Sequence, residues 1–221
     1  MNFDPGSRSK LTLRDLARFE GDSLFHRVAR QVCRAECLPR KELFEAWEVA
    51  RRTRRRFRGG RVLDLACGHG LLAHLLLVLD DSSEVALAVD TRLPKSASTL
   101  SAALLAEWPR LADRVTFIEG TLDSVPPRSG DLLVSCHACG SLTDDVLDRA
   151  IAAGARVAVL PCCHQTQGSD HGGLGGWLDV ALAIDVTRAA RLREHGYTVH
   201  TQTIPAEITP KNRLLLGDPR A

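Results

Sequence analysis

The sequence has no long uninterrupted apolar run, and this excludes a membrane-spanning helix. The longest run, Leu71–Leu79, is interrupted by His74 and is far shorter than the roughly 20 residues that such a helix needs. The first ten residues, MNFDPGSRSK, also lack the hydrophobic core of a secretion signal. Nothing in the sequence points to export, and we expect a cytoplasmic protein.

The cysteines do not follow the pattern of a disulfide framework. There are seven, an odd number, with irregular spacing, which is typical of reduced thiols in a cytoplasmic protein. Four of them lie in two short windows, SCHACGSLTDD (135–145) and LPCCHQTQG (160–168). The composition is otherwise ordinary for a globular protein, and 221 residues are enough for one domain with its own core.

Positive charge is unevenly distributed along the chain. The stretch RRTRRRFRGGR, from Arg51 to Arg61, contains seven arginines, although the net charge of the chain is only +2. Such a cluster is typical of proteins that bind nucleic acid, and we expect RNA as a partner through Arg51–Arg61. It also fits the end of a helix, where cations interact favourably with the helix dipole. The sequence leaves both interpretations open.

Helical patterns occupy the first quarter of the chain. A helix is predicted to begin after Pro39 and to end at Gly59–Gly60. We expect residues 1–58 to form an N-terminal helical cap on a domain of residues 59–221.

Beyond this cap, short apolar runs alternate with helical patterns. RVLDLA and EVALAVD predict buried strands, and LLAHLLLVL between them predicts a helix. The same alternation continues to a last pair of strands, YTVHTQTIP and NRLLLG. In the helix SLTDDVLDRAIAA, Ser141 and Asp144 are spaced as a capping box. The alternation predicts an α/β fold, with a mostly parallel sheet covered by helices on both faces.

A glycine-rich turn follows the first predicted strand. The segment DLACGHG, from Asp64 to Gly70, has the form acid-x-small-x-Gly-x-Gly and directly precedes a helix. Small residues there allow a sharp turn and a close approach of a ligand to the backbone. Asp90 ends the next strand, twenty residues after Gly70, where a carboxylate is expected to bind ribose hydroxyls. The order of these features predicts a nucleotide site.

The turn lacks the third glycine of the dinucleotide pattern. Leu72 or Ala73 stands in its place, and the turn begins with an acid. An acid suits a ligand that has a cationic amino-acid part and no phosphates, and this describes S-adenosylmethionine. A nicotinamide-dependent oxidoreductase remains the alternative enzyme, and a non-catalytic metal- or RNA-binding module the alternative without catalysis.

With these features the sequence resembles the class I S-adenosylmethionine-dependent methyltransferases, from about Gly60 to Gly217. The resemblance implies a Rossmann-like sheet of seven strands whose last strand is antiparallel. Ala66 stands where this family usually has glycine. The resemblance and the position of the motifs imply a set of residues that contact the cofactor S-adenosyl-L-methionine: Asp64, Ala66, Cys67, Gly68, Gly70, Asp90, Thr121, Leu122, Cys136 and His137.

The two cysteine windows follow the predicted fourth and fifth strands, so we expect their side chains to share one cleft. Four interpretations apply: a metal site, a redox dithiol, a cysteine nucleophile at Cys162 or Cys163, and a wall of the cofactor pocket. We favour the pocket wall and expect no metal. His164 and His137 are then the candidate catalytic bases.

Three motifs, HACGSLTD, PCCH and ITPKNRLLLG, resemble a narrower methyltransferase-like family. Its members include the glutathione S-transferase C-terminal-domain-containing protein and ribosomal RNA adenine dimethylase domain-containing proteins. This resemblance implies RNA as the acceptor class. The (Asn/Asp)-Pro-Pro-aromatic motif of many amino-group methyltransferases is absent, which argues against adenine-N6 methylation. The sequence thus predicts an S-adenosylmethionine-dependent methyltransferase that modifies RNA.

Overall fold

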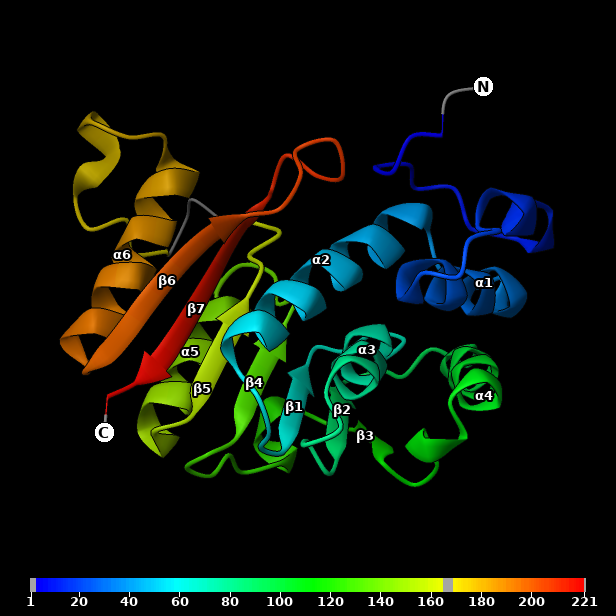
Figure 1. Ribbon diagram of the computed structural model, residues 1–221. Helices are drawn as coiled ribbons and strands as arrows, with labels where there is room; N and C mark the ends of the chain where they lie inside the picture. Colours follow the sequence, from blue (N-terminus) through cyan, green and yellow to red (C-terminus); the bar gives the residue numbers. More distant parts are fainter. Residues whose placement is uncertain (1–2, 165–168, 221) are drawn as a thin grey trace.

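The computed structural model describes residues 3–164 and 169–220. Its centre is a seven-stranded sheet with the order β3-β2-β1-β4-β5-β7-β6 (Figure 1). The strands are β1 Val62–Leu65, β2 Ala86–Asp90, β3 Val115–Glu119, β4 Leu132–Ser135, β5 Arg156–Val159, β6 Tyr197–Thr203 and β7 Arg213–Pro219. The α-helices are α1 Leu24–Ala35, α2 Arg40–Arg56, α3 Leu71–Leu79, α4 Ala97–Glu107, α5 Leu142–Ala153 and α6 Val180–Glu194.

The strand pairing confirms the predicted fold class. Strands β1 to β5 pair in parallel, and β7 runs antiparallel to both β5 and β6. Every residue of β1 and β4 is buried, as expected for strands covered on both faces. The closing hairpin of β6 and β7 is the one expected from YTVHTQTIP and NRLLLG.

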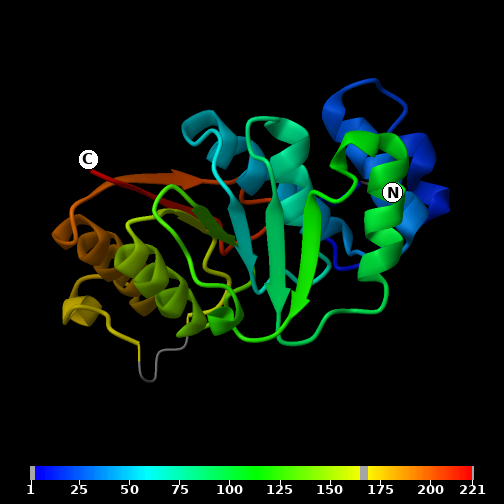
Figure 2. The same cartoon turned by 90° about the horizontal axis from the view of Figure 1, so that it is seen from below.

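Helices cover both faces of the sheet, so the molecule has three layers (Figures 1 and 2). On one face the sheet packs with α1 to α4 around an apolar core that includes Val28, Leu43 and Leu76. On the other face a smaller core contains Val146, from α5, and Leu192, from α6. Helices α1 and α2 share the larger core with α3 and α4, so the predicted N-terminal cap is packed as part of this layer. No helix in residues 3–164 and 169–220 is long and apolar enough to cross a bilayer.

Two segments that are distant in sequence meet at the carboxyl edge of the parallel strands. A Cβ atom on Gly6 would lie 2.7 Å from the carbonyl oxygen of Glu207, in the connection between β6 and β7. The chain near the N-terminus and this connection both lie at the upper end of the strands in Figure 1. The carboxyl edge is therefore bordered by residues from both ends of the chain.

The predicted capping box at the start of α5 is wrong. Ser141 makes no side-chain cap hydrogen bond, and its backbone is already helical (φ −64°, ψ −22°). Asp144 instead accepts two hydrogen bonds from the buried guanidinium of Arg188, at 3.0 and 2.7 Å. A tertiary ion pair with α6 has replaced the local bond.

Candidate active site

The glycine-rich turn has the backbone conformation that the sequence requires. Ala66, Gly68 and Gly70 all have positive φ angles, of 59°, 52° and 70°, a region that favours glycine. At Gly70 a Cβ atom would lie 2.6 Å from the ring of Phe117, whereas at Gly68 it would meet no atom within 4 Å. Gly70 is thus needed for packing between strand and helix, while Gly68 borders open space.

Asp64 lies beneath this turn and caps the following helix. Its side chain is buried, and its Oδ2 atom accepts a hydrogen bond from the Ala73 amide at 3.0 Å. Negative charge at a helix N-terminus is favourable. Burial nevertheless raises the pKa of the Asp64 carboxyl to about 7, although the bond from Ala73 opposes this. Near neutral pH the carboxyl can therefore respond to a cation bound above it.

Asp90 connects the turn to the end of β2. Its Oδ2 atom accepts a hydrogen bond from the Gly68 amide at 2.9 Å, and Oδ1 accepts one from the Arg92 amide at 3.2 Å. A carboxylate has about four lone-pair sites, so two remain for a ligand. Asp90 is half-buried and lines a cavity, so these sites are accessible to ligand hydroxyls.

This cavity has a volume of about 270 Å³. Its lining includes three predicted site residues besides Asp90, namely Ala66, Thr121 and Leu122. Leu142 and Arg149, from α5, close the opposite wall. Asp90 gives the cavity a carboxylate for a ribose, and Leu122 and Leu142 give it apolar surface for a base, although Asp123, Asp145 and Arg149 also line it.

A narrower cavity shares Ala66 with the first and continues towards α2. Five further predicted residues line it: Asp64, Cys67, Gly68, Cys136 and His137. Gly70 is not in the lining but belongs to the same turn. The rest of the cavity wall includes His69, Leu71 and Leu72, together with three residues that the sequence did not identify, Leu38, Glu42 and Ala46. Leu38 precedes α2 and the other two lie within it, and only the packing of α2 against the turn brings them to the site.

Glu42 and His137 both line this narrower cavity. Burial raises the pKa of the Glu42 carboxyl, and the nearby His137 partly offsets this. His137 itself is exposed, so its ring is accessible from the carboxyl edge. Together with Asp64, Glu42 gives the cavity two carboxyl groups, which suits a ligand with a cationic end.

The two cysteine windows separate into three environments. Cys136 is buried at the narrower cavity with His137. Cys139, Cys162 and Cys163 instead gather in a separate thiol cluster. His164 belongs to neither group, and Gln165–Gly168 lie outside the described residues.

His164 is held in a buried polar network. Its side chain is only 3% exposed, and its Nε2 atom lies 2.8 Å from Asp185 Oδ1. Arg213 donates to the other oxygen of Asp185 at 2.6 Å. Burial opposes ionisation of Asp185, but the hydrogen bonds from His164 and Arg213 hold the pKa of its carboxyl below the usual value. Of the two predicted catalytic histidines, only His137 lines the narrower cavity.

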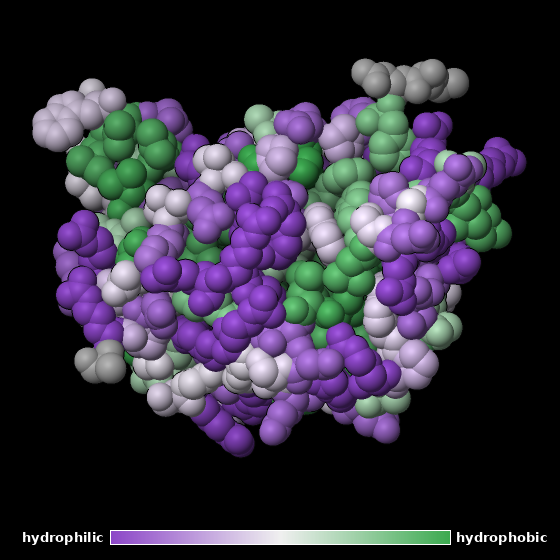
Figure 3. All heavy atoms as spheres, in the orientation of Figure 1, coloured by the Kyte–Doolittle hydropathy of each residue, from purple (hydrophilic) through white to green (hydrophobic). Residues whose placement is uncertain are grey.

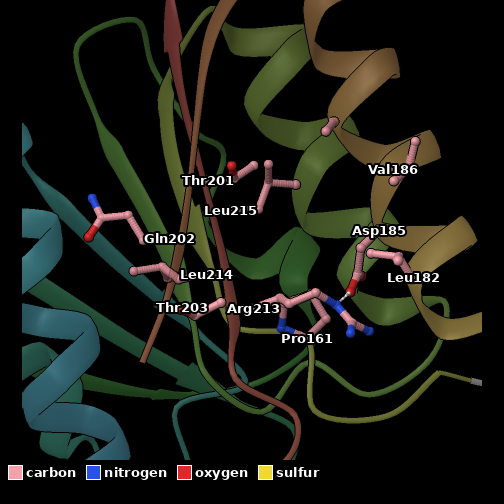
Figure 4. A pocket seen from close by; sticks show the side chains of 11 residues that line it. Pro161, Leu182, Asp185, Val186, Thr201, Gln202, Thr203, Arg213, Leu214 and Leu215 are labelled. Atoms are coloured by element: carbon pink, nitrogen blue, oxygen red, sulfur yellow. Dashed lines mark hydrogen bonds and ion pairs between the residues drawn. The ribbon is translucent and has the colours of Figure 1, made fainter. Parts of the chain in front are cut away.

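A third cavity, of about 530 Å³, lies between α6 and the edge strands β6 and β7 (Figure 4). The Asp185–Arg213 ion pair lies beside Pro161 in this view, and apolar side chains such as Leu182 and Leu215 form much of the wall. Among the predicted cofactor residues, none lines this cavity.

Most arginines of the predicted RNA-binding run are engaged within the protein. Arg51 and Arg52 pair with Glu48, Arg54 is buried against Asp80, and Arg61 pairs with Asp131. Hydrophilic side chains gather in the middle of the face that carries α2 (Figure 3). The run leads into the start of β1, at the lower end of the strands in Figure 1. The first two cavities are instead lined by residues that follow the carboxyl ends of β1, β2 and β4.

Comparison with known proteins defines the class. A family model described as a methyltransferase domain matches residues 42–167, more than half of the chain. The chain belongs to this methyltransferase family. A search of curated proteins found no significant match.

Solved structures agree at the level of the fold. The precorrin-6y C5,15-methyltransferase of Geobacter metallireducens GS-15 superposes with a TM-score of 0.52 at 15% identity, covering 78% of this chain and 88% of its own. A putative O-methyltransferase of Nostoc punctiforme PCC 73102 has a TM-score of 0.51 at 16% identity, covering 92% of this chain and 67% of its own.

The protein is an S-adenosylmethionine-dependent methyltransferase. It is therefore neither a nicotinamide-dependent oxidoreductase nor a non-catalytic module, the two alternatives that the sequence left open. The residues of the first two cavities fit the methyl donor, because Asp90 offers free lone pairs, Gly68 leaves room, and the narrower cavity contains carboxyl groups for a cationic end.

The pKa of Asp64 gives a first prediction. Ligand-free Asp64 holds a proton below about pH 7, whereas a bound cation favours the ionised carboxylate. Donor binding should then release a proton, and its affinity should rise about fivefold to tenfold from pH 6 to pH 7.5. Calorimetry in buffers of different ionisation enthalpy measures both effects. Asp64→Asn should remove the pH dependence, and an equal dependence in that variant would refute the assignment.

Proposed function

We propose that this methyltransferase acts on RNA, and that the RNA lies along the carboxyl edge of the sheet. The observation that carries this proposal is a set of exposed cations at that edge that have no ion-pair partner among residues 3–164 and 169–220: Lys10, Arg92, Lys95 and Lys211. Unpaired cations beside an active site favour a polyanionic acceptor.

These cations surround the proposed donor site. Arg92 and Lys95 follow β2 directly after Asp90. Lys10 lies close enough to His69, which lines the narrower cavity, to help lower the pKa of its ring, although burial is the larger cause. Lys211 lies in the connection between β6 and β7. Phosphates on either side of the acceptor nucleotide would therefore meet cations from different parts of the chain.

An exposed aromatic side chain adds a second feature suited to RNA. Trp177 is 87% exposed and lies three residues before α6, and the segment that leads into α6 lies at the upper end of the strands in Figure 1. Single-stranded RNA is commonly bound by stacking an unpaired base on such a side chain.

The proposed mechanism is mainly one of positioning. The donor supplies an electrophilic methyl group when bound. Asp90 would hold the ribose hydroxyls, and Thr121 and Leu122 would border the base. The turn at Gly68 would let the methionine part approach the backbone, and Asp64 would balance its positive charge. Fixing donor and acceptor in line accounts for most of the expected rate enhancement.

His137 is the histidine best placed to accept a proton from the acceptor. It is exposed, lines the narrower cavity and lies near Glu42. The buried His164 would instead fix the loop after β5 through Asp185. If so, His137→Ala should reduce kcat much more than donor affinity.

The test is methyl transfer from tritiated S-adenosylmethionine to total RNA and, separately, to protein extract. We expect label in RNA, and RNA binding that weakens steeply with salt. Charge reversal in Lys95→Glu/Lys211→Glu should weaken RNA binding by about tenfold or more, and reduce the salt dependence.

A matched control comes from the other edge. Arg55 and Arg56 are exposed at the C-terminal end of α2, so Arg55→Glu/Arg56→Glu changes the same charge far from the donor site. This variant should change RNA affinity less than twofold. Label found only in protein, or a larger loss in the control variant than in the edge variant, would contradict the proposal.

A further inference from the structure

The thiol cluster of Cys139, Cys162 and Cys163 is not used by the proposed methyl-transfer mechanism. The three sulfur atoms lie within 4.8 Å of one another, although Cys139 is more than twenty residues from the other two. We propose that this cluster is a binding site for a single thiophilic metal ion, and that the ion is Zn²⁺ held by three thiolates.

The sulfur positions already fit one ion. The Sγ–Sγ distances are 3.1 Å for Cys139–Cys162, 3.4 Å for Cys139–Cys163 and 3.8 Å for Cys162–Cys163. A tetrahedral zinc with bonds of about 2.3 Å requires sulfurs roughly 3.8 Å apart. From the three observed distances, a point about 2.3 Å from every sulfur exists roughly 1 Å above their plane. Small shifts of the side chains therefore complete the geometry.

The same distances disfavour the other uses of these cysteines. In a [4Fe–4S] cluster each thiolate binds a different iron, so the sulfurs would lie further apart. A disulfide requires about 2.05 Å between two sulfurs and would leave the third unused. Cys139 lies at similar distances from both partners, which suits shared coordination of one ion.

The backbone brings the thiols together before any metal binds. The amide of Gly140 donates to the carbonyl of Cys163 at 3.1 Å, joining the loop after β4 to the loop after β5. Arg188 donates to the carbonyl of Gly140 at 3.0 Å and fixes this junction from α6. Such preorganisation lowers the conformational cost of binding a metal.

The cluster is open to solvent on one side. Cys139 and Cys163 are exposed and Cys162 is half-buried, so an ion can enter and keep a fourth position for water or another ligand. Three protein ligands and an open position are typical of accessible zinc sites. Burial raises the pKa of the Cys139 and Cys162 thiols, so Zn²⁺ must displace their protons. Each thiol that binds loses one proton to solvent, and no electrons are transferred.

The test is a metal titration of the full-length chain. Protein treated with a chelator and kept reduced should bind one equivalent of Co²⁺, with the thiolate charge-transfer and tetrahedral ligand-field bands, and Zn²⁺ should displace it. Affinity should fall steeply at lower pH as protons compete. Cys139→Ser, Cys162→Ser and Cys163→Ser should each weaken binding by at least about 100-fold, while substitution of the buried Cys33 of α1 by alanine (Cys33→Ala) should keep full stoichiometry.

Circular dichroism should show that each variant remains folded, because two of the three cysteines are exposed and serine is expected to be tolerated there. Absence of the cobalt bands in reduced wild-type protein would overturn the proposal. Equal metal binding by all three serine variants would do the same. The site does not depend on the acceptor, so failure of the RNA assay leaves this test unaffected.

Discussion

Asp90→Ala should reduce the affinity for S-adenosylmethionine by about 100-fold and abolish detectable methyl transfer. The carboxylate has two free lone-pair positions beside the larger cavity. Hydrogen bonds to a charged group contribute about 1.5–3 kcal/mol each, and two of them account for a loss of that size. Isothermal titration calorimetry with S-adenosylmethionine measures it.

Asp81→Ala is the matched control for this variant. Asp81 is an exposed carboxylate that pairs with Arg110 and Arg114, away from the cavities. Its removal should leave donor affinity unchanged within twofold. Gly68→Ala provides an independent check. Its Cβ atom meets no protein atom and would occupy space meant for the donor, and the positive φ of 52° adds strain in the turn that acts in the same direction. Normal donor binding by both Asp90→Ala and Gly68→Ala would show that the donor binds elsewhere.

Arg54→Ala should destabilise the fold by about 3–5 kcal/mol, because it leaves the buried carboxylate of Asp80 with only the exposed Arg58, at 3.7 Å, as an ion-pair partner. The guanidinium is 2% exposed and lies 3.2 Å from Asp80. It also donates to the carbonyl of Leu76 at 3.0 Å and to Ser83 Oγ at 2.8 Å. Burial lowers the pKa of Arg54 to about 10, so the side chain stays charged at neutral pH. Urea unfolding gives the free-energy change.

Arg55→Ala, one position along the same helix, is the control. Arg55 is exposed, and its loss should change stability by less than about 0.5 kcal/mol. If Arg54→Ala were as stable as Arg55→Ala but bound RNA much more weakly, the arginine run would serve RNA rather than the fold.

The sequence predicted the sheet and the glycine turn because local rules decide both. The turn from Asp64 to Gly70 contains residues with positive φ angles, and at Gly70 it approaches Phe117 closely. Only small residues allow both features. Asp90 was identifiable because a parallel strand ends at the ligand edge. These features lie within one continuous segment of chain.

Other features depend on contacts between distant segments and could not be read from the sequence. Glu42 reaches the donor-side cavity only because α2 packs against the turn. Arg54 and Arg61 resemble surface cations in sequence, yet ion pairs with Asp80 and Asp131 hold them in the protein. The sequence predicted that the side chains of both cysteine windows share one cleft. In the structure Cys136 instead lines the narrower cavity, while Cys139 joins the thiol cluster.

A crystal structure with S-adenosylhomocysteine tests the central claim most directly. We predict ribose hydroxyls within hydrogen-bonding distance of Asp90, the base between Leu122 and Leu142, and the amino-acid part above Asp64 at the turn of Gly68. Electron density for the ligand in the cavity between α6 and β6, with the glycine turn free of it, would contradict the account.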